Sequence, residues 1–187
     1  MIIALVGVTG IGKSFFKNQI VENLKFKNLV IVTTINKRDG EINGVDKEFV
    51  TLEQFKKMKE NNEIKCDFEF LDNYYAYKKE DLESNENQVT EVHYNRIYDM
   101  KKNAKDLFSI YIIPNDVERA KSEVKKRNLP KKVEKKRLEE IDEHMENFAK
   151  DKKLQKQFDY IFVNDYTDKS KEKLLNVINK MIKEEIK

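Results

Sequence analysis

The sequence predicts a three-layer α/β fold in which helices cover both faces of a mainly parallel sheet. An apolar, β-branched run over residues 2–6 ends at a glycine, which is typical of a buried strand. Phe16, Ile20 and Leu24 then recur at the spacing of one helix face. Strands and helices alternate in this way along the chain, and such alternation favours parallel strands with right-handed crossovers.

Three further strands are expected after the first. Residues 29–32 form a short β-branched run, and residues 108–113 form a longer apolar run that stops at Pro114. Residues 158–163 form the last. Runs that are apolar at successive positions are typical of strands buried on both faces, as in a parallel sheet with helices on each side.

Two helices near the end of the chain have clear local signals. Asn115 or Asp116 is expected to cap the helix after Pro114, because Glu118 follows Asn115 at the spacing of a capping box. The closing helix has one apolar face, made of Leu174, Ile178, Met181 and Ile182.

The segment from about residue 35 to 88 does not follow the alternation. Its turn cluster at 39–44 and its aromatic stretch at 68–77 predict a small mixed α+β lobe inserted into the sheet domain. We therefore expect a single domain over residues 1–187, with a core at about 1–34 and 89–187.

Composition limits the location and partners that we expect. Lys and Arg total 37 against 34 Asp and Glu, and this net charge of +3 is too small to indicate nucleic-acid binding. Cys66 is the only cysteine, so no intramolecular disulfide can form. No stretch approaches the roughly 20 apolar residues of a membrane helix, and residues 1–6 are too short for a signal peptide. We expect a cytoplasmic protein with no membrane or nucleic-acid partner.

The loop after the first strand carries a phosphate-binding motif. Its residues, Gly7, Val8, Thr9, Gly10, Ile11, Gly12, Lys13 and Ser14, match G-x-x-x-x-G-K-[ST] between a strand and a helix. Glycines let several backbone N–H groups converge on one phosphate, and the following helix dipole adds positive potential. Lys13 is expected to reach the β and γ phosphates of ATP, and the Ser14 hydroxyl to bind Mg²⁺. The alternative is a chance glycine-rich turn.

The rest of the chain resembles the guanylate kinase family. Residues 33–46, TTINKRDGEINGVD, are similar to the family's T-T-R-x-P-R-x-G-E-x-x-G-x-D-Y motif. Phe49-Val50 with Phe55 is similar to F-V-S-x-x-x-F, residues 73–75 to G-N-Y-Y-G, and residues 163–165 to V-N-D-D. The resemblance implies transfer of the ATP γ-phosphate to GMP, with a core, an acceptor-binding lobe at about 35–88 and a lid at about 125–137.

The resemblance also implies roles for single residues. Those expected to bind the acceptor are Thr34, Arg38, Cys66, Tyr75 and His93; Asn164 is expected to bind ATP, and Glu91 to lie near Mg²⁺. Lys13, Arg127 and Arg137 are expected to be catalytic, because lid arginines neutralise charge on the transferring group. Alternatively, Arg38 is an ordinary surface arginine, and Arg127 and Arg137 are basic residues on a solvated helix. Tyr75 would then be a packed loop residue, and Glu91 an edge-strand glutamate that faces solvent.

Several positions differ from the family pattern. Ile35 stands where the family has the first arginine of T-T-R, and Lys47 where it has the tyrosine after G-x-D. Cys66 stands where the family has the glutamate that reads guanine. His93, Ala76 and Glu123 replace an aspartate, a glycine and the first lid arginine. Unpaired guanine N–H donors would cost roughly 1–3 kcal/mol each. Asp67 could supply a carboxylate if the register shifts by one, and Lys37 or Lys47 could restore phosphate charge. Cys66 is read as a structural thiol.

These differences leave the acceptor open. The first expectation is a kinase that uses Mg²⁺ and ATP to phosphorylate GMP, with small-molecule nucleotides as partners, as a monomer or homodimer. The alternatives are a kinase of the same fold acting on another nucleotide or a ribose phosphate, and a lapsed binding module like those of scaffold proteins. An intact Lys13 and Ser14 in a short chain argue against the lapsed module.

Overall fold

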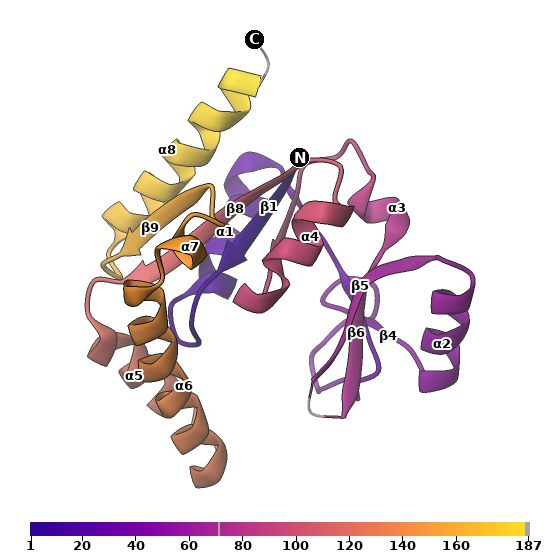
Figure 1. The fold of residues 1–187 in the computed structure, drawn as a ribbon, viewed down its shortest axis with the longest axis horizontal. Helices are drawn as coiled ribbons and strands as arrows, with labels where there is room; N and C mark the ends of the chain where they lie inside the picture. The colour runs from indigo at the N-terminus through magenta and orange to yellow at the C-terminus, as the bar shows by residue number, and fades with distance from the viewer. Residues whose placement is uncertain (71, 186–187) are drawn as a thin grey trace.

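Five parallel strands form the central sheet of this computed structural model, which describes residues 1–70 and 72–185 (Figure 1). Their order is β2-β7-β1-β8-β9, with β1 at Ile2–Val6, β2 at Lys27–Asn28, β7 at Gln88–Glu91, β8 at Leu107–Pro114 and β9 at Tyr160–Asn164. Each neighbouring pair in this order runs parallel. The parallel α/β core expected from the alternating pattern is confirmed.

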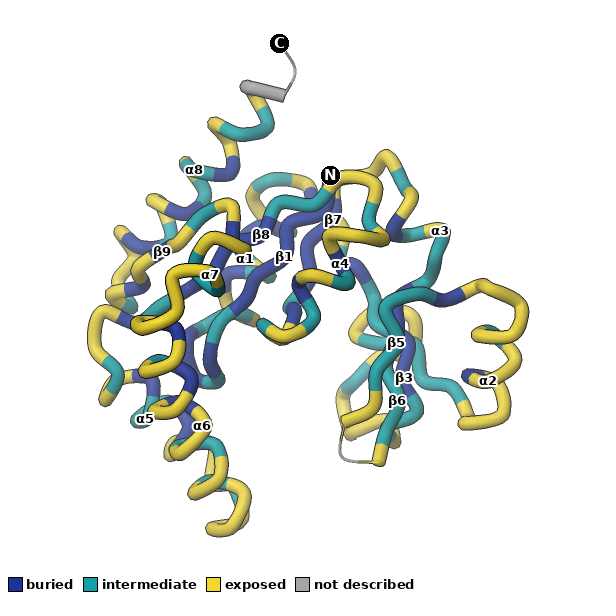
Figure 2. The backbone as a smooth tube through the Cα atoms, viewed as in Figure 1, coloured by how far each residue is buried: buried dark blue, intermediate teal, exposed yellow. Residues whose placement is uncertain are grey.

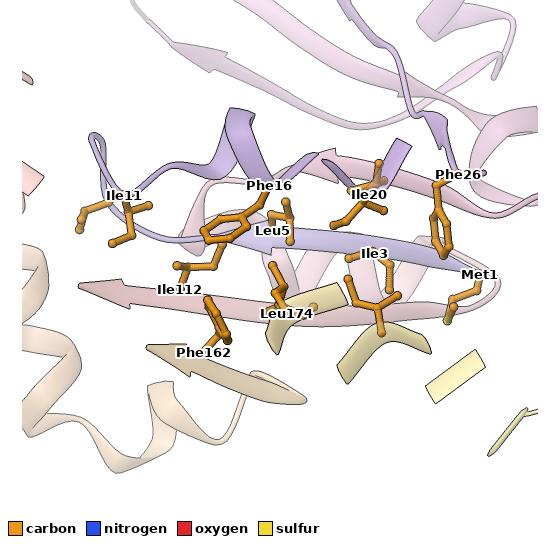
Figure 3. Close-up of a cluster of buried hydrophobic side chains, with 14 of the residues drawn as sticks. Met1, Ile3, Leu5, Ile11, Phe16, Ile20, Phe26, Ile112, Phe162 and Leu174 are labelled. Atoms are coloured by element: carbon orange, nitrogen blue, oxygen red, sulfur yellow. The ribbon is translucent and has the colours of Figure 1, made fainter. Parts of the chain in front are cut away.

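Helices cover both faces of this sheet. Ile3 and Leu5 of β1 pack with α1 (Lys13–Leu24) and α8 (Asp168–Glu185), in the cluster that Figure 3 shows in close-up. The alternate residues of β1 pack on the other side with α4 (Ile97–Asn103), α6 (Lys131–Lys150) and α7 (Lys152–Gln155). Because side chains alternate between the two faces of a strand, β1 is buried completely, as its dark colour in Figure 2 shows.

The expected cap and the apolar face of the last helix are confirmed, although the cap is Asp116 and not Asn115, so the capping-box spacing of Asn115 with Glu118 is not the one used. Asp116 caps α5 (Val117–Lys125), and its side chain accepts a hydrogen bond of 2.9 Å from the Glu118 backbone N–H. In α8, Leu174 and Ile178 are fully buried. Met181 and Ile182 pack against the same cluster and are partly buried. No helix in residues 1–70 and 72–185 is long and apolar enough to cross a membrane.

A second, mixed sheet stands beside the central one (Figure 1). Its order is β4-β3-β6-β5, with β3 at Ile31–Thr33, β4 at Glu48–Phe49, β5 at Ile64–Phe70 and β6 at Asn73–Lys78. One face packs on Phe55 of α2 (Leu52–Glu60), through a small apolar cluster. Tyr77 and Cys66 on the other side pack against the core cluster. The short helix α3 (Lys79–Leu82) and a 3₁₀ turn at Tyr94–Arg96 complete the connections.

The expected strand at residues 29–32 is wrong as a single element. Lys27–Asn28 pairs with β7 in the central sheet, and Ile31–Thr33 pairs with β6 in the second sheet. Between them, the Leu29 N–H still donates to the Val89 carbonyl at 2.9 Å. The run is extended, as its β-branched residues indicate, but it passes from one sheet to the other. Gln88, at the limit of the expected lobe at about 35–88, pairs with Ile2 of the core.

Phe16 and Phe15 provide a test of the core. Phe16 is 2% exposed and packs edge-to-face on Phe162 at 5.6 Å between ring centroids. We expect Phe16→Ala to lower the free energy of unfolding by about 3–5 kcal/mol, measured by urea denaturation. Phe15, its neighbour, is 50% exposed, so Phe15→Ala should cost less than about 1 kcal/mol. Equal losses in the two variants would contradict the packing described.

Candidate active site

The loop between β1 and α1 has a backbone that only glycine adopts easily at two positions. Gly10 has φ of 81°, and a Cβ there would lie 2.3 Å from the Ala120 carbonyl oxygen of α5. Gly12 has φ of 89° and precedes the first turn of α1. The loop therefore lies close against α5, and its N–H groups lie at the N-terminus of α1, a position that favours an anion.

Lys13 is held by the loop itself. Its Nζ donates hydrogen bonds of 2.9 Å to the carbonyl oxygens of Gly7 and Val8. Burial lowers the pKa of Lys13 to about 8, and within the described residues no carboxylate lies at ion-pair distance from it. A partly buried cation that is bonded to neutral carbonyls is favourably placed to pair with a phosphate.

A cleft of about 1350 Å³ opens beside this loop. It is lined by the phosphate-binding loop, the start of α1, Phe70 of β5, the end of β7, α5, α6 and the segment after β9. Among the predicted site residues it contains Gly7, Val8, Thr9, Gly10, Gly12, Lys13, Ser14, Glu91, His93, Arg127, Arg137 and Asn164. Ile11 lies behind the loop and is fully buried in the core.

The two predicted lid arginines lie on this cleft with Lys13. The Arg137 Nη1 of α6 donates to the Thr9 Oγ1 of the loop at 3.3 Å, while its Nε is buried and has no hydrogen-bond partner among the described residues. The positive charges of Arg127 and Arg137 both contribute to lowering the pKa of Lys13. Three cations therefore act on one another across the cleft, which creates a strongly positive site for a polyphosphate.

Ser14 and Glu91 supply oxygen donors beside the loop. Ser14 is exposed in the first turn of α1, and its hydroxyl makes no hydrogen bond within the described residues. The Glu91 carboxylate ends β7 and lies 3.9 Å from Lys17 Nζ. A hydroxyl and a carboxylate suit Mg²⁺, which takes few protein ligands when it also binds phosphates and water. No group of three or more His, Cys, Asp or Glu that could hold a metal ion occurs in the described residues.

Asn164 connects the loop to the end of β9. It is buried at the end of β9, and its Nδ2 donates to the Ile11 carbonyl at 3.0 Å. Its Oδ1 accepts from the Tyr166 N–H at 2.9 Å. Its side-chain amide is thus used within the protein, so Asn164 positions both the loop and the segment that follows β9.

Tyr166 and Arg119 also line the cleft, and they are not among the predicted site residues. The Tyr166 hydroxyl donates to the Gly10 carbonyl at 3.4 Å, and the Arg119 guanidinium lies 5.5 Å from the centre of the Tyr166 ring. Arg119 also pairs with Glu123, one turn further along α5. The position of Tyr166 directly after the residues 163–165 was the available signal, whereas nothing local distinguishes Arg119 from other helix arginines.

Most predicted acceptor residues lie on the second sheet, away from the cleft lining. The Thr34 Oγ1 accepts from the Tyr74 N–H at 2.9 Å, and the Tyr75 ring stacks on Phe68 at 5.1 Å between centroids. Arg38 is exposed on the loop before β4, where its backbone N–H donates to Glu41 at 2.9 Å. Lys47 is bonded to the same glutamate, so its charge is already paired.

His93 and Cys66 occupy different surroundings. His93 lies on the cleft, with its Nδ1 2.7 Å from Asn95 Oδ1 and its Nε2 3.8 Å from Glu140 Oε1 of α6. The Cys66 thiol faces α4 instead, and its pKa is raised to about 11, mainly by burial. The structure thus separates these two predicted acceptor contacts.

Known proteins resemble this chain along its whole length. The family model for guanylate kinase matches residues 1–181. The guanylate kinase of Mycoplasmoides gallisepticum is 27% identical over 186 residues, covering 96% of this chain and 92% of the relative. That of Malacoplasma penetrans is 28% identical over 191 residues, covering 98% and 94%. The crystal structure of guanylate kinase from Anaplasma phagocytophilum has a TM-score of 0.68 at 24% identity, covering 97% and 85%. This last likeness confirms the fold.

The depressed pKa of Lys13 predicts a pH dependence of ATP binding. Burial lowers this pKa to about 8, so the ammonium is charged below that pH and loses its proton above it. Because the triphosphate binds the charged form better, affinity should be constant near pH 7 and fall by up to about tenfold per pH unit above pH 8. Isothermal titration calorimetry should then show proton uptake on binding at alkaline pH.

Lys13→Arg is the matched control for this prediction, because a guanidinium stays charged throughout the range. Its affinity for MgATP, whatever its absolute value, should not change between about pH 7 and pH 10. The same alkaline fall in both proteins would assign the titration to another group.

Proposed function

We propose that this chain, which belongs to the guanylate kinase family, transfers the γ-phosphate of ATP to GMP and so produces ADP and GDP. The observation that carries this proposal is the convergence of Lys13, Arg127 and Arg137 on one cleft beside an intact phosphate-binding loop. The family model covers both the loop and the second sheet, so the match includes the donor and acceptor regions.

The loop holds the donor by complementing its charge. Backbone N–H groups of the loop and the N-terminus of α1 face the β phosphate, and Lys13 exchanges its carbonyl partners for phosphate oxygens. Ser14 and Glu91 would hold Mg²⁺, either directly or through water. When bound, this ion neutralises charge on the β and γ phosphates. No covalent intermediate is needed, because an acceptor phosphate oxygen attacks the γ-phosphorus in line.

The arginines stabilise the transition state. Arg137 already contacts the loop through Thr9, and its buried Nε has a hydrogen atom to donate. Arg127 follows α5 on the same cleft and brings a second guanidinium. Donors that are held in place before the reaction cost little reorganisation as negative charge spreads over the transferring phosphoryl group.

Acceptor binding is assigned to the second sheet. Arg38 and Tyr75 hold the GMP phosphate, and Thr34 supports this segment through its bond to Tyr74. His93, on the cleft, lies toward the base, whereas the Cys66 thiol is already bonded to the Asp99 carbonyl of α4. Thr34, Arg38, Cys66 and Tyr75 do not line the cleft, but Phe70 of β5 does, so this lobe borders the site of phosphoryl transfer. The division into a core, an acceptor lobe and a lid at about 125–137 therefore has a functional meaning in this proposal.

The action on small-molecule nucleotides in the cytoplasm, as a monomer or homodimer, stays a prediction.

A coupled assay for ADP release tests the activity. MgATP should be consumed with GMP, and Lys13→Ala should lower kcat at least about 1000-fold because the γ-phosphate loses its cation. AMP, UMP, CMP and ribose phosphates serve as alternative acceptors in parallel. Turnover with one of these and not with GMP would replace the acceptor and retain the kinase. ATP binding without turnover on any acceptor would instead indicate a binding module.

Arg137 and Lys135 provide a matched pair on α6. Arg137→Met should lower kcat by at least about 100-fold with a small effect on the KM for ATP, because its contacts strengthen in the transition state. Lys135 is 79% exposed on the same helix and pairs only with Glu139 in the described residues, so Lys135→Met should leave kcat within about twofold. An unchanged kcat in Arg137→Met would remove this arginine from the mechanism.

A further inference from the structure

The edge of the second sheet that faces α4 is irregular at Cys66. The pairing of β5 with β6 shifts register between Lys65 and Phe68, and Cys66 adopts φ of 55° in this bulge. Its thiol is thereby directed to α4, where it donates to the Asp99 carbonyl at 3.4 Å. The bulge therefore places a neutral hydrogen-bond donor, already in use, at the junction between the lobe and the core.

Neither carboxylate of β5, Asp67 or Glu69, supplies a hydrogen-bond acceptor at this junction. Asp67, the next residue, is bound 2.5 Å from Lys59 Nζ of α2, which packs on the opposite face of the sheet. Glu69 alternates with Phe68 along the strand, so its side chain points to the face opposite that of Phe68. Asp67 thus lies within the bulge of the β5–β6 pairing, and its carboxylate is paired with Lys59.

Arg96 lies at this junction from the core side. Its guanidinium is 4.9 Å from the centre of the Phe68 ring, and Phe68 in turn stacks on Tyr75 with 14° between the ring planes. Arg96 Nη1 is 3.3 Å from Asp99 Oδ2, which is its one side-chain hydrogen bond within the described residues. The side chain is 32% exposed. The junction thus offers an aromatic surface and a fork of free N–H donors, with no carboxylate from β5.

We propose that Arg96 determines which base the acceptor carries, by donating two hydrogen bonds to O6 and N7 of guanine. A guanidinium fork matches these two acceptors, which lie side by side on one edge of guanine. Adenine presents an N6 amino donor in place of O6, so the same fork rejects it. The opposite edge, with N1–H and the 2-amino group, is not read by a β5 carboxylate. This inference rests on the proposed GMP kinase activity.

Base analogues test this assignment in the wild-type enzyme. IMP lacks only the 2-amino group, so its kcat/KM should lie within about tenfold of that for GMP. The nucleotide 7-deaza-GMP has a C–H in place of N7, so it should lose about 10- to 100-fold. A loss of more than about 100-fold for IMP, with 7-deaza-GMP unaffected, would overturn the inference.

Substitution of Arg96 tests it in the protein. Arg96→Gln should lower the ratio of kcat/KM for GMP to that for AMP at least about tenfold, because glutamine reads N6 and N7 of adenine. The KM for ATP should not change. Lys102→Gln removes a charge from the exposed side of α4 and should leave the ratio unchanged. Arg96→Lys keeps the charge and most of the stem but loses the fork, so it should lower kcat/KM for GMP about tenfold.

The outcomes separate the two proposals. If Arg96 served only to hold α4 on β5, its variants would lower turnover of every acceptor alike, and the inference would fail while GMP kinase activity remained. An unchanged GMP-to-AMP ratio in a folded Arg96→Gln enzyme, checked by circular dichroism, would have the same meaning. If Arg96→Gln did not fold, an unchanged kcat/KM for GMP in folded Arg96→Lys would overturn the inference. Absence of GMP turnover in the wild-type enzyme would overturn both proposals at once.

Discussion

The complete burial of β1 is the constraint on which the phosphate site depends. This strand lies between β7 and β8, and its alternate side chains enter two separate apolar clusters. Because both faces and both edges are occupied, the strand cannot shift, and the loop that begins at its carboxyl end has a defined origin. α1 is then fixed by Phe16 and Ile20 on one of these clusters. The loop is thus anchored at both ends.

The positively charged side chains at the cleft are placed to bind an anionic ligand. Lys13 is bonded to backbone carbonyls, and Arg137 has a buried Nε for which residues 1–70 and 72–185 supply no acceptor. Buried donors without acceptors are unfavourable for the free protein, and a polyphosphate supplies the missing oxygens. The Arg137 Nε and the Lys13 ammonium therefore become a source of affinity and of transition-state stabilisation.

The second sheet uses its two faces differently. One face is an ordinary small core, in which Phe55 of α2 packs on Val32, Ile64 and Ala76. The other carries Tyr75 and Tyr77 and meets the central domain near α4. An acceptor that binds on this second face touches both units, so its specificity depends on side chains from each. Arg96 belongs to the core by its position in the chain, but it contacts the lobe through Phe68.

The residues alone specify the features that depend on near neighbours in the chain. The glycine spacing, the lysine and the flanking strand and helix predicted the phosphate-binding loop, because that loop closes within one turn of the backbone. The Asp116 cap and the apolar face of α8 are local for the same reason. Only the tertiary structure decided which sheet each part of residues 27–33 joins, since their partners β6 and β7 lie far along the chain. It also decided that Arg137 meets Thr9 and that Arg96 meets Phe68, because contacts between distant segments depend on how helices and sheets pack and not on local spacing.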